Sequence, residues 1–311
     1  MTKVAFVFPG QGSQKVGMGK EFAEKNGEYF EKANQVLGFS LSNLILEGPQ
    51  EELTVTYNAQ PALMTVGTMI ASKLIDAGIT PDYTAGHSLG EYTALVASGV
   101  LSFEDGVSVV HKRGLYMNDA VPAGVGAMAA ILGLDSEAVK KVTDEITATG
   151  DAVQPANLNC PGQIVISGTK AGVDKACVEL KEVGARRAIP LDVSGPFHSS
   201  LMKPAAEELS AALDGVTMKN ASIPVVTNVN AKVVEDSNQM KKLLVEQLYS
   251  PVLWEDSVRT LLSNGVTHFI ECGPGKVLSG LIKKIDRTAT VLPVYDELTL
   301  QEVIDASKGW S

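Results

Sequence analysis

Residues 86–91, with the sequence GHSLGE, constrain the fold of this chain more than any other segment. They place Ser88 inside a Gly-x-Ser-x-Gly pattern, after residues 81–85, which favour a short strand, and before residues 91–97, which favour a helix. The flanking glycines let the backbone bend sharply and expose the serine oxygen. The helix that follows points its N-terminal N–H groups at negative charge developing beside that oxygen. We therefore predict a nucleophilic Ser88 rather than a serine that only caps a helix.

A nucleophilic serine needs a base, and the sequence contains four histidines. His87 adjoins the nucleophile on a sharp turn, so its side chain should leave in another direction. His111 and His268 fall in a helical and a strand-like pattern, which favour packed or surface positions. His198 lies in a Gly-Pro turn after a predicted strand, and irregular loops of this kind often carry active-site residues. We predict His198 as the base, against the alternative of a surface histidine. No aspartate between Ser88 and His198 is distinguished as a third member, although Asp105, Asp119 and Asp192 are available.

The order of the predicted elements places the chain in the α/β class. Strand and helix patterns alternate through residues 1–123, and strand patterns return after residue 194. This alternation is typical of a mostly parallel sheet, and with the serine turn it favours a hydrolase-like core. The predicted elements are a strand at residues 3–8, helices near 18–37 and 60–76, and strands at 225–229 and 266–272.

Residues 124–193 interrupt this alternation with the order βαββαβ, which is that of a ferredoxin-like unit. We therefore expect a hydrolase-like catalytic subdomain of residues 1–123 and 194–311, and an inserted ferredoxin-like small subdomain of residues 124–193. A cleft between the two would bring Ser88 and His198 together. The elements predicted in the insertion are strands at 127–132, 153–159, 163–167 and 186–193, with helices at 136–146 and 170–183.

Composition excludes several classes of protein. Hydrophobic residues make up 45% and charged residues 20% of the 311 residues, which is typical of a globular protein with a large core. The net charge of −10 argues against general binding of nucleic acid, which favours a basic surface. The N-terminal residues lead into a strand without a cleavage signal, and no apolar run is long enough to span a membrane. Three cysteines fit neither a disulfide framework nor a zinc site, so we expect a cytoplasmic location.

Two glycine-rich segments do not match nucleotide-binding loops. Residues 8–14 (FPGQGSQ) lack the Gly-x-Gly-x-x-Gly spacing, and residues 273–277 (GPGKV) lack the earlier glycine and the following Ser or Thr of a P-loop. The first segment instead favours a loop at the carboxyl end of the first strand, where open α/β sheets bind ligands. Its N–H groups could stabilise an oxyanion, or the loop could be a simple strand-to-helix connection.

Four motifs in order, FPGQGSQ (8–14), GHSLGE (86–91), GPFHS (195–199) and ECGPGK (271–276), resemble the malonyl-CoA:acyl-carrier-protein transacylase family. The resemblance spans essentially the whole chain, and polyketide synthase acyltransferase domains share this family. It implies an acyltransferase that moves malonyl from malonyl-CoA to the phosphopantetheine thiol of acyl carrier protein in fatty acid elongation. The mechanism would be ping-pong, through a malonyl ester on the serine. It implies no metal and no redox cofactor, because the CoA thioester is a substrate and the phosphopantetheine belongs to the carrier.

The resemblance also implies catalytic roles for matching positions. Ser88 would carry the malonyl ester, and His198 would act as general base and acid. The backbone N–H groups of Gln11 and Leu89 would form the oxyanion hole. The backbone carbonyl of Gln247 would orient the histidine, which explains why no aspartate stands out as a third member.

Substrate contacts are implied at four further positions. Arg113 matches the arginine that pairs with the malonyl carboxylate, although alone it would be interpreted as a solvated helix charge. Phe197 would leave little room for a branched acyl group. Asn157 and Asn159 would face the cleft and contact pantetheine.

The sequence leaves two other classes of function open. A serine hydrolase would use the same serine and histidine but gives no reason for an arginine at the acyl site. A non-catalytic scaffold that binds carrier protein would need neither residue. We expect malonyl-CoA and acyl carrier protein as partners, neither nucleic acid nor membrane, and a monomer. Because the carrier is acidic, we expect it to dock on one of two basic clusters, which are Arg186 with Arg187, and Lys276, Lys283, Lys284 with Arg287.

Overall fold

The computed structural model describes residues 2–310, without the side chains of residues 24–26, and centres on a six-stranded sheet. Five neighbouring strands pair in parallel, and the edge strand β8 pairs antiparallel with β7. The predicted α/β class with a mostly parallel sheet is therefore confirmed. Across the sheet the strands are β10 (Thr290–Val294), β9 (His268–Cys272), β1 (Val4–Phe8), β2 (Tyr83–Gly86), β7 (Val225–Val226) and β8 (Val233–Val234).

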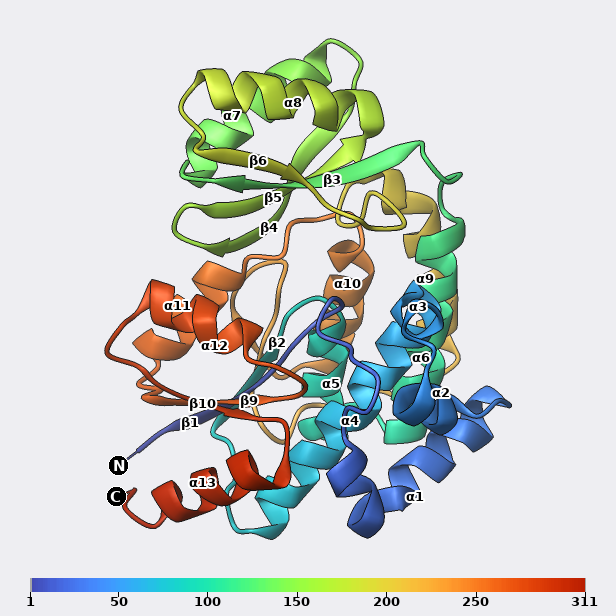
Figure 1. Ribbon diagram of the computed structural model, residues 1–311, viewed down its shortest axis with the longest axis vertical. Coiled ribbons are helices and arrows are strands. Elements are labelled where there is room, and N and C mark those ends of the chain that lie inside the picture. The colour runs from blue at the N-terminus through green and yellow to red at the C-terminus, as the bar shows by residue number, and fades with distance from the viewer. Residues whose placement is uncertain (1, 311) are drawn as a thin grey trace.

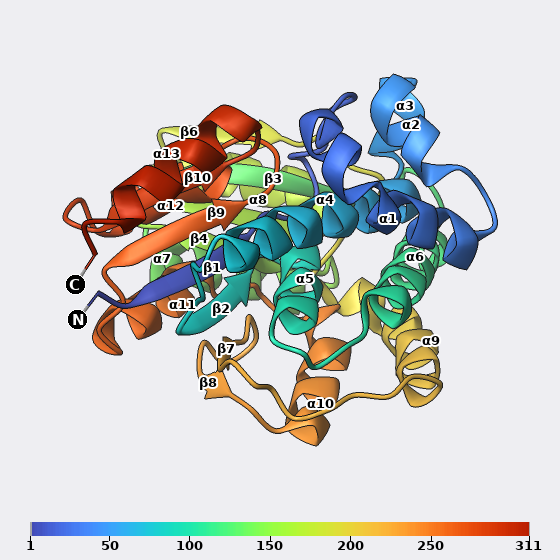
Figure 2. The ribbon, with the colours of Figure 1, turned by 90° about the horizontal axis from the view of Figure 1, so that it is seen from below.

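Helices cover both faces of this sheet because the side chains of each strand alternate between the faces. In β1, Phe6 and Phe8 pack against one group of helices, whereas Ala5 and Val7 pack against another. All four side chains are almost completely buried. The first group includes α4 (Thr56–Asp76), α5 (Leu89–Ala97) and α6 (Phe103–Asp119), and the second includes α11 (Trp254–Ser263) and α12 (Val277–Ile285), as Figure 2 shows.

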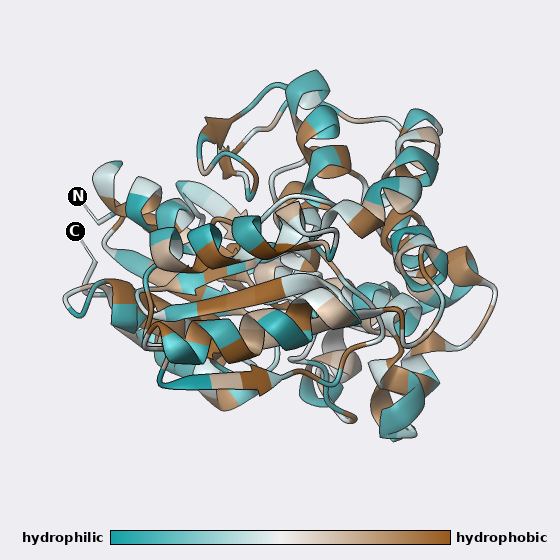
Figure 3. Ribbon diagram, turned by 90° about the horizontal axis from the view of Figure 1, so that it is seen from above, coloured by the Kyte–Doolittle hydropathy of each residue, from teal (hydrophilic) through white to brown (hydrophobic). Residues whose placement is uncertain are grey.

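A second sheet of four antiparallel strands lies above the first one in Figure 1, in the order β4-β5-β3-β6. Ala129 and Ile131 of β3 pack under two helices, and Met128, which precedes Ala129, lines a cavity on the opposite side. Figure 3 shows hydrophilic and hydrophobic residues alternating along the helices on top. The elements are β3 (Gly126–Leu132), α7 (Ser136–Ala148), β4 (Val153–Cys160), β5 (Gln163–Thr169), α8 (Lys170–Glu182) and β6 (Arg187–Pro190).

Strands β6 and β7 end earlier in the structure than predicted, and residues that follow each strand lie near Ser88 instead. Strand β6 ends at Pro190 instead of residue 193, and residues 191–193 line the cavity. Strand β7 ends at Val226 instead of residue 229, which frees Asn228 to bind the serine turn. Helix α4 begins at Thr56, four residues before the predicted start.

The remaining elements complete the layer of helices around the large sheet. Within residues 2–310, no helix combines the length and apolar character that crossing a membrane requires. The remaining helices around the large sheet are α1 (Lys20–Leu37), α2 (Leu41–Glu47), α3 (Gln50–Thr54), the short 3₁₀ helix η1 (Ser200–Met202), α9 (Lys203–Asp214), α10 (Ser237–Gln247) and α13 (Glu297–Ser307).

Candidate active site

Ser88 occupies a strained turn between β2 and α5. Its backbone has φ 52° and ψ −109°, outside the regions that ordinary residues adopt. The two flanking glycines are required by close backbone approach. A Cβ on Gly86 would lie 1.9 Å from the carbonyl carbon of Gly90, and a Cβ on Gly90 would lie 2.0 Å from the Phe8 carbonyl oxygen. The turn therefore raises the serine at the carboxyl ends of β1 and β2, as the sequence predicts.

The structure brings His198 to Ser88 across 110 residues of sequence. The Ser88 Oγ and the His198 Nε2 are 2.8 Å apart. On the other side of the ring, His198 Nδ1 lies 2.8 Å from the backbone oxygen of Gln247, at the end of α10. A carbonyl oxygen only accepts, so Nδ1 carries the proton and Nε2 accepts from the serine hydroxyl. The ring is thus held in the tautomer that a general base needs.

Burial sets the charge of this histidine. The His198 side chain is buried, and burial together with the nearby Arg113 cation lowers the pKa of His198 to about 3. The hydrogen bond to the Gln247 carbonyl raises the pKa of His198, but this effect is smaller than the lowering by burial and by Arg113. His198 is therefore neutral at physiological pH, which leaves Nε2 free to take the serine proton.

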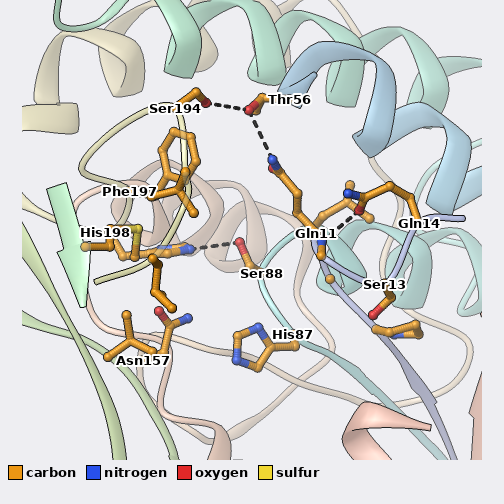
Figure 4. Close-up of a pocket in the computed structure, with 18 of the residues that line it drawn as sticks. Gln11, Ser13, Gln14, Thr56, His87, Ser88, Asn157, Ser194, Phe197 and His198 are labelled. Atoms are coloured by element: carbon orange, nitrogen blue, oxygen red, sulfur yellow. Dashed lines mark hydrogen bonds between the residues drawn. The ribbon is translucent and has the colours of Figure 1, made fainter. Parts of the chain in front are cut away.

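The two residues whose backbone N–H groups we expect to form an oxyanion hole both lie beside the serine. Leu89 begins α5, and Gln11 lies in the loop after β1; both line the cavity at Ser88. In the hydrogen bonds of residues 2–310, neither N–H group donates to a protein acceptor. The Gln11 side chain donates to the Thr56 hydroxyl at 3.1 Å, and that hydroxyl lies 2.9 Å from the Ser194 hydroxyl (Figure 4). This chain of side chains fixes the Gln11 loop against α4.

Arg113 is buried beside the nucleophile instead of solvated on its helix. Its guanidinium donates to the Gln60 Oε1 at 2.7 Å, the Gln247 Oε1 at 2.8 Å and the Ser88 Oγ at 3.1 Å. It stacks over the Tyr92 ring at 5.3 Å. Among the described residues, no carboxylate forms an ion pair with it within 4.0 Å, and its Nε has no hydrogen-bond partner. A buried cation without a contacting anion favours the binding of an anionic ligand.

A buried polar network behind the nucleophile was not identified from the sequence. The Asn228 side chain accepts from the Ser88 N–H at 2.8 Å and donates to the Gly86 carbonyl at 2.6 Å. The Glu91 carboxylate accepts from the Asn228 N–H at 3.0 Å and from the Gln247 side chain at 2.8 Å. Glu91 directly follows the Gly-x-Ser-x-Gly pattern, and this position could have marked it as part of the site. Asn228 lies in no recognisable sequence pattern.

Ser88 lies at a cavity of about 600 Å³, which is lined by strands of the small sheet and by loops and helices that follow the strands of the large sheet. Phe197 lies beside His198 in the wall of this cavity, and Asn157 and Asn159 line it from β4 (Figure 4). The Asn159 Oδ1 lies 2.8 Å from the His87 Nε2, so His87 is turned away from the serine as expected. Eight of the nine sequence-predicted site residues therefore line one cavity, and the ninth, Gln247, lies behind the His198 ring.

Strand β4 also ties the small sheet to the histidine loop. The Gln154 side chain donates to the carbonyl oxygens of His198 at 3.2 Å and Tyr249 at 3.3 Å, and accepts from the Ser200 N–H at 2.9 Å. His198 itself has φ 58°, a conformation that non-glycine residues rarely adopt. These contacts stabilise the strained loop that carries the base.

Other candidates from the sequence lie outside this catalytic arrangement. The His111 ring binds the Tyr57 carbonyl, and the His268 ring packs against Trp310. In the basic cluster after the Gly-Pro-Gly turn, Lys283 donates to backbone carbonyls of its own segment, whereas Lys284 reaches Gln163 at the cavity wall. Among the described residues, no three His, Cys, Asp or Glu side chains are placed to hold a metal ion.

Comparisons with known proteins match this geometry. Residues 5–298 match the acyl transferase domain family. The malonyl CoA-acyl carrier protein transacylase of Bacillus subtilis (strain 168) is 58% identical over 311 residues, which cover 99% of this chain and 98% of that protein. The structure of the acyl-carrier-protein S-malonyltransferase from Burkholderia pseudomallei 1710b has 48% identity and a TM-score of 0.95, covering 98% of this chain and 100% of that one. A malonyl-transacylase solved in complex with its type II PKS acyl-carrier protein has 42% identity, a TM-score of 0.95 and coverage of 98% and 100%. The chain therefore belongs to the acyl transferase domain family, among its malonyl-CoA:acyl-carrier-protein transacylases.

Proposed function

We propose that this protein transfers malonyl from malonyl-CoA to the phosphopantetheine thiol of acyl carrier protein, through an ester on Ser88. The observation that carries the proposal is the buried Arg113, without a contacting carboxylate, 3.1 Å from the serine oxygen that is hydrogen-bonded to His198. A serine and histidine alone perform acyl transfer of many kinds. The arginine adds a preference for an acyl group that carries its own carboxylate.

The first half-reaction forms the malonyl ester. His198 Nε2 takes the proton as Ser88 Oγ attacks the thioester carbonyl, and the N–H groups of Gln11 and Leu89 stabilise the oxyanion. The carbon–sulfur bond then breaks, and His198 returns the proton to the CoA sulfur. The Gln247 carbonyl stabilises the ring while it is charged.

The second half-reaction repeats these steps with the thiol of the carrier. His198 takes the thiol proton, the sulfur attacks the malonyl ester, and the serine oxygen leaves with that proton. The two steps together form a ping-pong mechanism that needs no redox or metal cofactor.

The shape of the cavity suits this pair of substrates. A malonyl group fills a small part of about 600 Å³, so most of the space is available for a pantetheine arm. We propose that Asn157 and Asn159 contact this arm, because both amides line the cavity from β4. Phe197 beside the base limits the space around the acyl group, which favours malonyl over branched acyl groups.

We further propose that residues 124–193 act as a subdomain covering the site that residues 1–123 and 194–311 build. Its β4 strand holds the histidine loop through Gln154 and pairs with Val252 through backbone hydrogen bonds of 2.8 and 2.9 Å. We also propose a cytoplasmic location, in keeping with three cysteines that are all unpaired. The monomeric state stays a prediction.

The test is the mass of the intact protein after incubation with malonyl-CoA alone. We expect one malonyl adduct on the wild type and none on Ser88→Ala, which should keep its thermal melting curve. An adduct that persists in Ser88→Ala would refute the nucleophile. Continuous release of CoA without a carrier would identify a serine hydrolase, and failure of a serine-reactive probe to label Ser88 would favour a scaffold.

A further inference from the structure

Glu91 is a buried carboxylate at the active site that has no role in the proposed reaction. It lies in the first turn of α5 with 1% of its surface exposed. A glutamate at this position often caps its own helix by accepting from the N-cap N–H group. Here the N-cap N–H group, that of Ser88, donates to Asn228 instead. The Glu91 carboxylate is therefore available for another interaction.

That interaction runs through the side chain of Gln247 to Arg113. The amide nitrogen of Gln247 donates to Glu91 Oε2 at 2.8 Å, and its amide oxygen accepts from Arg113 Nη2 at 2.8 Å. The opposite charges fix the orientation of the amide, because the reverse orientation would place N–H groups against the cation. One amide thus separates the carboxylate from the guanidinium.

We propose that Glu91 is the counter-charge of Arg113 and sets how strongly the active site prefers malonyl over neutral acyl groups. This inference rests on the proposed malonyl transfer. A direct ion pair would occupy the guanidinium and block a substrate carboxylate. A counter-charge one side chain away leaves the Nε–H group of Arg113 without a protein partner, yet it reduces the attraction of Arg113 for a second anion. The malonyl carboxylate is thereby bound without being held so tightly that transfer is slowed.

The groups packed around Glu91 make its charge sensitive to pH. Burial raises the pKa of Glu91 to about 7, although the hydrogen bonds from Asn228 and Gln247 and the charge of Arg113 oppose this rise. Burial also raises the pKa of the neighbouring Tyr92 hydroxyl, which is therefore neutral, and His198 is neutral as well. Arginine and malonyl both stay charged across this range. The preference for malonyl should therefore be strong below pH 7, where Glu91 is protonated, and weaker above it.

The experiment compares kcat/KM for malonyl-CoA with that for acetyl-CoA, since the ratio cancels changes in the nucleophile and the base. The variant Glu91→Gln keeps an oxygen that can accept from Asn228 and Gln247 but removes the charge. At pH 8 we expect this variant to raise the malonyl-to-acetyl ratio by roughly three- to tenfold. The wild-type ratio should fall between pH 6 and pH 8, and the ratio of the variant should stay flat.

The matched control is Glu271→Gln, which removes the charge of another buried carboxylate. Glu271 accepts hydrogen bonds from Leu278 and Ser279 at the start of α12, and among the described residues no arginine forms an ion pair with it. If Glu271→Gln weakens the binding of CoA, it should lower kcat/KM for malonyl-CoA and for acetyl-CoA by the same factor and leave their ratio unchanged. If Glu91→Gln folds and its malonyl-to-acetyl ratio of kcat/KM equals that of the wild type, the proposal is overturned. If the variant does not fold, a wild-type ratio that stays constant between pH 6 and pH 8 overturns it. The absence of any malonyl-serine in the wild type would instead refute the proposed function.

Discussion

Replacing Arg113 with alanine separates recognition of the acyl group from the chemistry at the serine. The substitution removes a buried cation that contacts Gln60, Gln247 and Ser88 but leaves the hydrogen bond between Ser88 and His198 in place. Malonyl transfer should fall steeply, because its carboxylate would enter a buried site without a partner. Acetyl transfer should change little, because an acetyl group has no carboxylate to lose.

The magnitude follows from the number of contacts. A hydrogen bond between charged groups contributes about 1.5–3 kcal/mol, and a guanidinium offers a carboxylate two of them. Losing both corresponds to a decrease of roughly 10²- to 10⁴-fold in kcat/KM for malonyl-CoA. The contact between Arg113 and the Ser88 oxygen involves a neutral acceptor, so its loss should cost acetyl transfer only about tenfold or less.

The assay is steady-state transfer to holo acyl carrier protein from malonyl-CoA and from acetyl-CoA, supported by intact mass of the acyl-enzyme. Arg113→Lys is the matched variant, because it keeps a charge but lacks the planar pair of N–H donors. It should retain part of the malonyl preference. If Arg113→Ala lowers both activities in parallel while its melting temperature is kept, the arginine is structural and the reasoning is wrong.

Three further predictions concern the base, the acyl pocket and the carrier. Because burial lowers the pKa of His198 to about 3, its neutral form persists as pH falls through 6.5. In Glu91→Gln, which lacks the nearby carboxyl group with a pKa of about 7, the labelling rate of Ser88 by an uncharged probe should therefore stay constant from pH 7 to pH 5, and an inflection near pH 6.5 would contradict the burial argument. Replacing Phe197 with alanine should increase methylmalonyl transfer relative to malonyl by an amount worth about 1–3 kcal/mol, measured as the ratio of kcat/KM values, and an equal ratio would exclude a steric role. Charge reversal at Lys284 should raise KM for the carrier in a salt-dependent way without slowing formation of the malonyl-enzyme. Charge reversal at Arg186 and Arg187 should have this effect only if the carrier binds that cluster. If KM for the carrier depends neither on these substitutions nor on salt, docking is not electrostatic.

The nucleophile could be predicted from the sequence because its geometry is local. A strand, a turn with two glycines and a helix follow one another within a few residues, and close backbone approach at Gly86 and Gly90 makes those glycines necessary. The sequence pattern likewise predicted β1 and the helices α1, α4, α7 and α8, since period 2 and period 3.6 are properties of single segments. Strands β6 and β7 end earlier than predicted, because residues 191–193 line the cavity and Asn228 binds the backbone of Ser88 instead of continuing the sheet.

The surroundings of the nucleophile were decided by tertiary structure. The partner of His198 is a backbone carbonyl of Gln247, and a backbone oxygen carries no side-chain signature. Arg113 has the pattern of a surface charge on α6, and only the packing of α4 and α10 around it makes it a buried cation. Glu91 follows the serine motif directly, yet its role depends on Gln247, which lies 156 residues away in sequence. Charge, burial and hydrogen-bond partners depend on which segments meet in space, so the sequence by itself determined where the serine stands, and the tertiary structure determined what surrounds it.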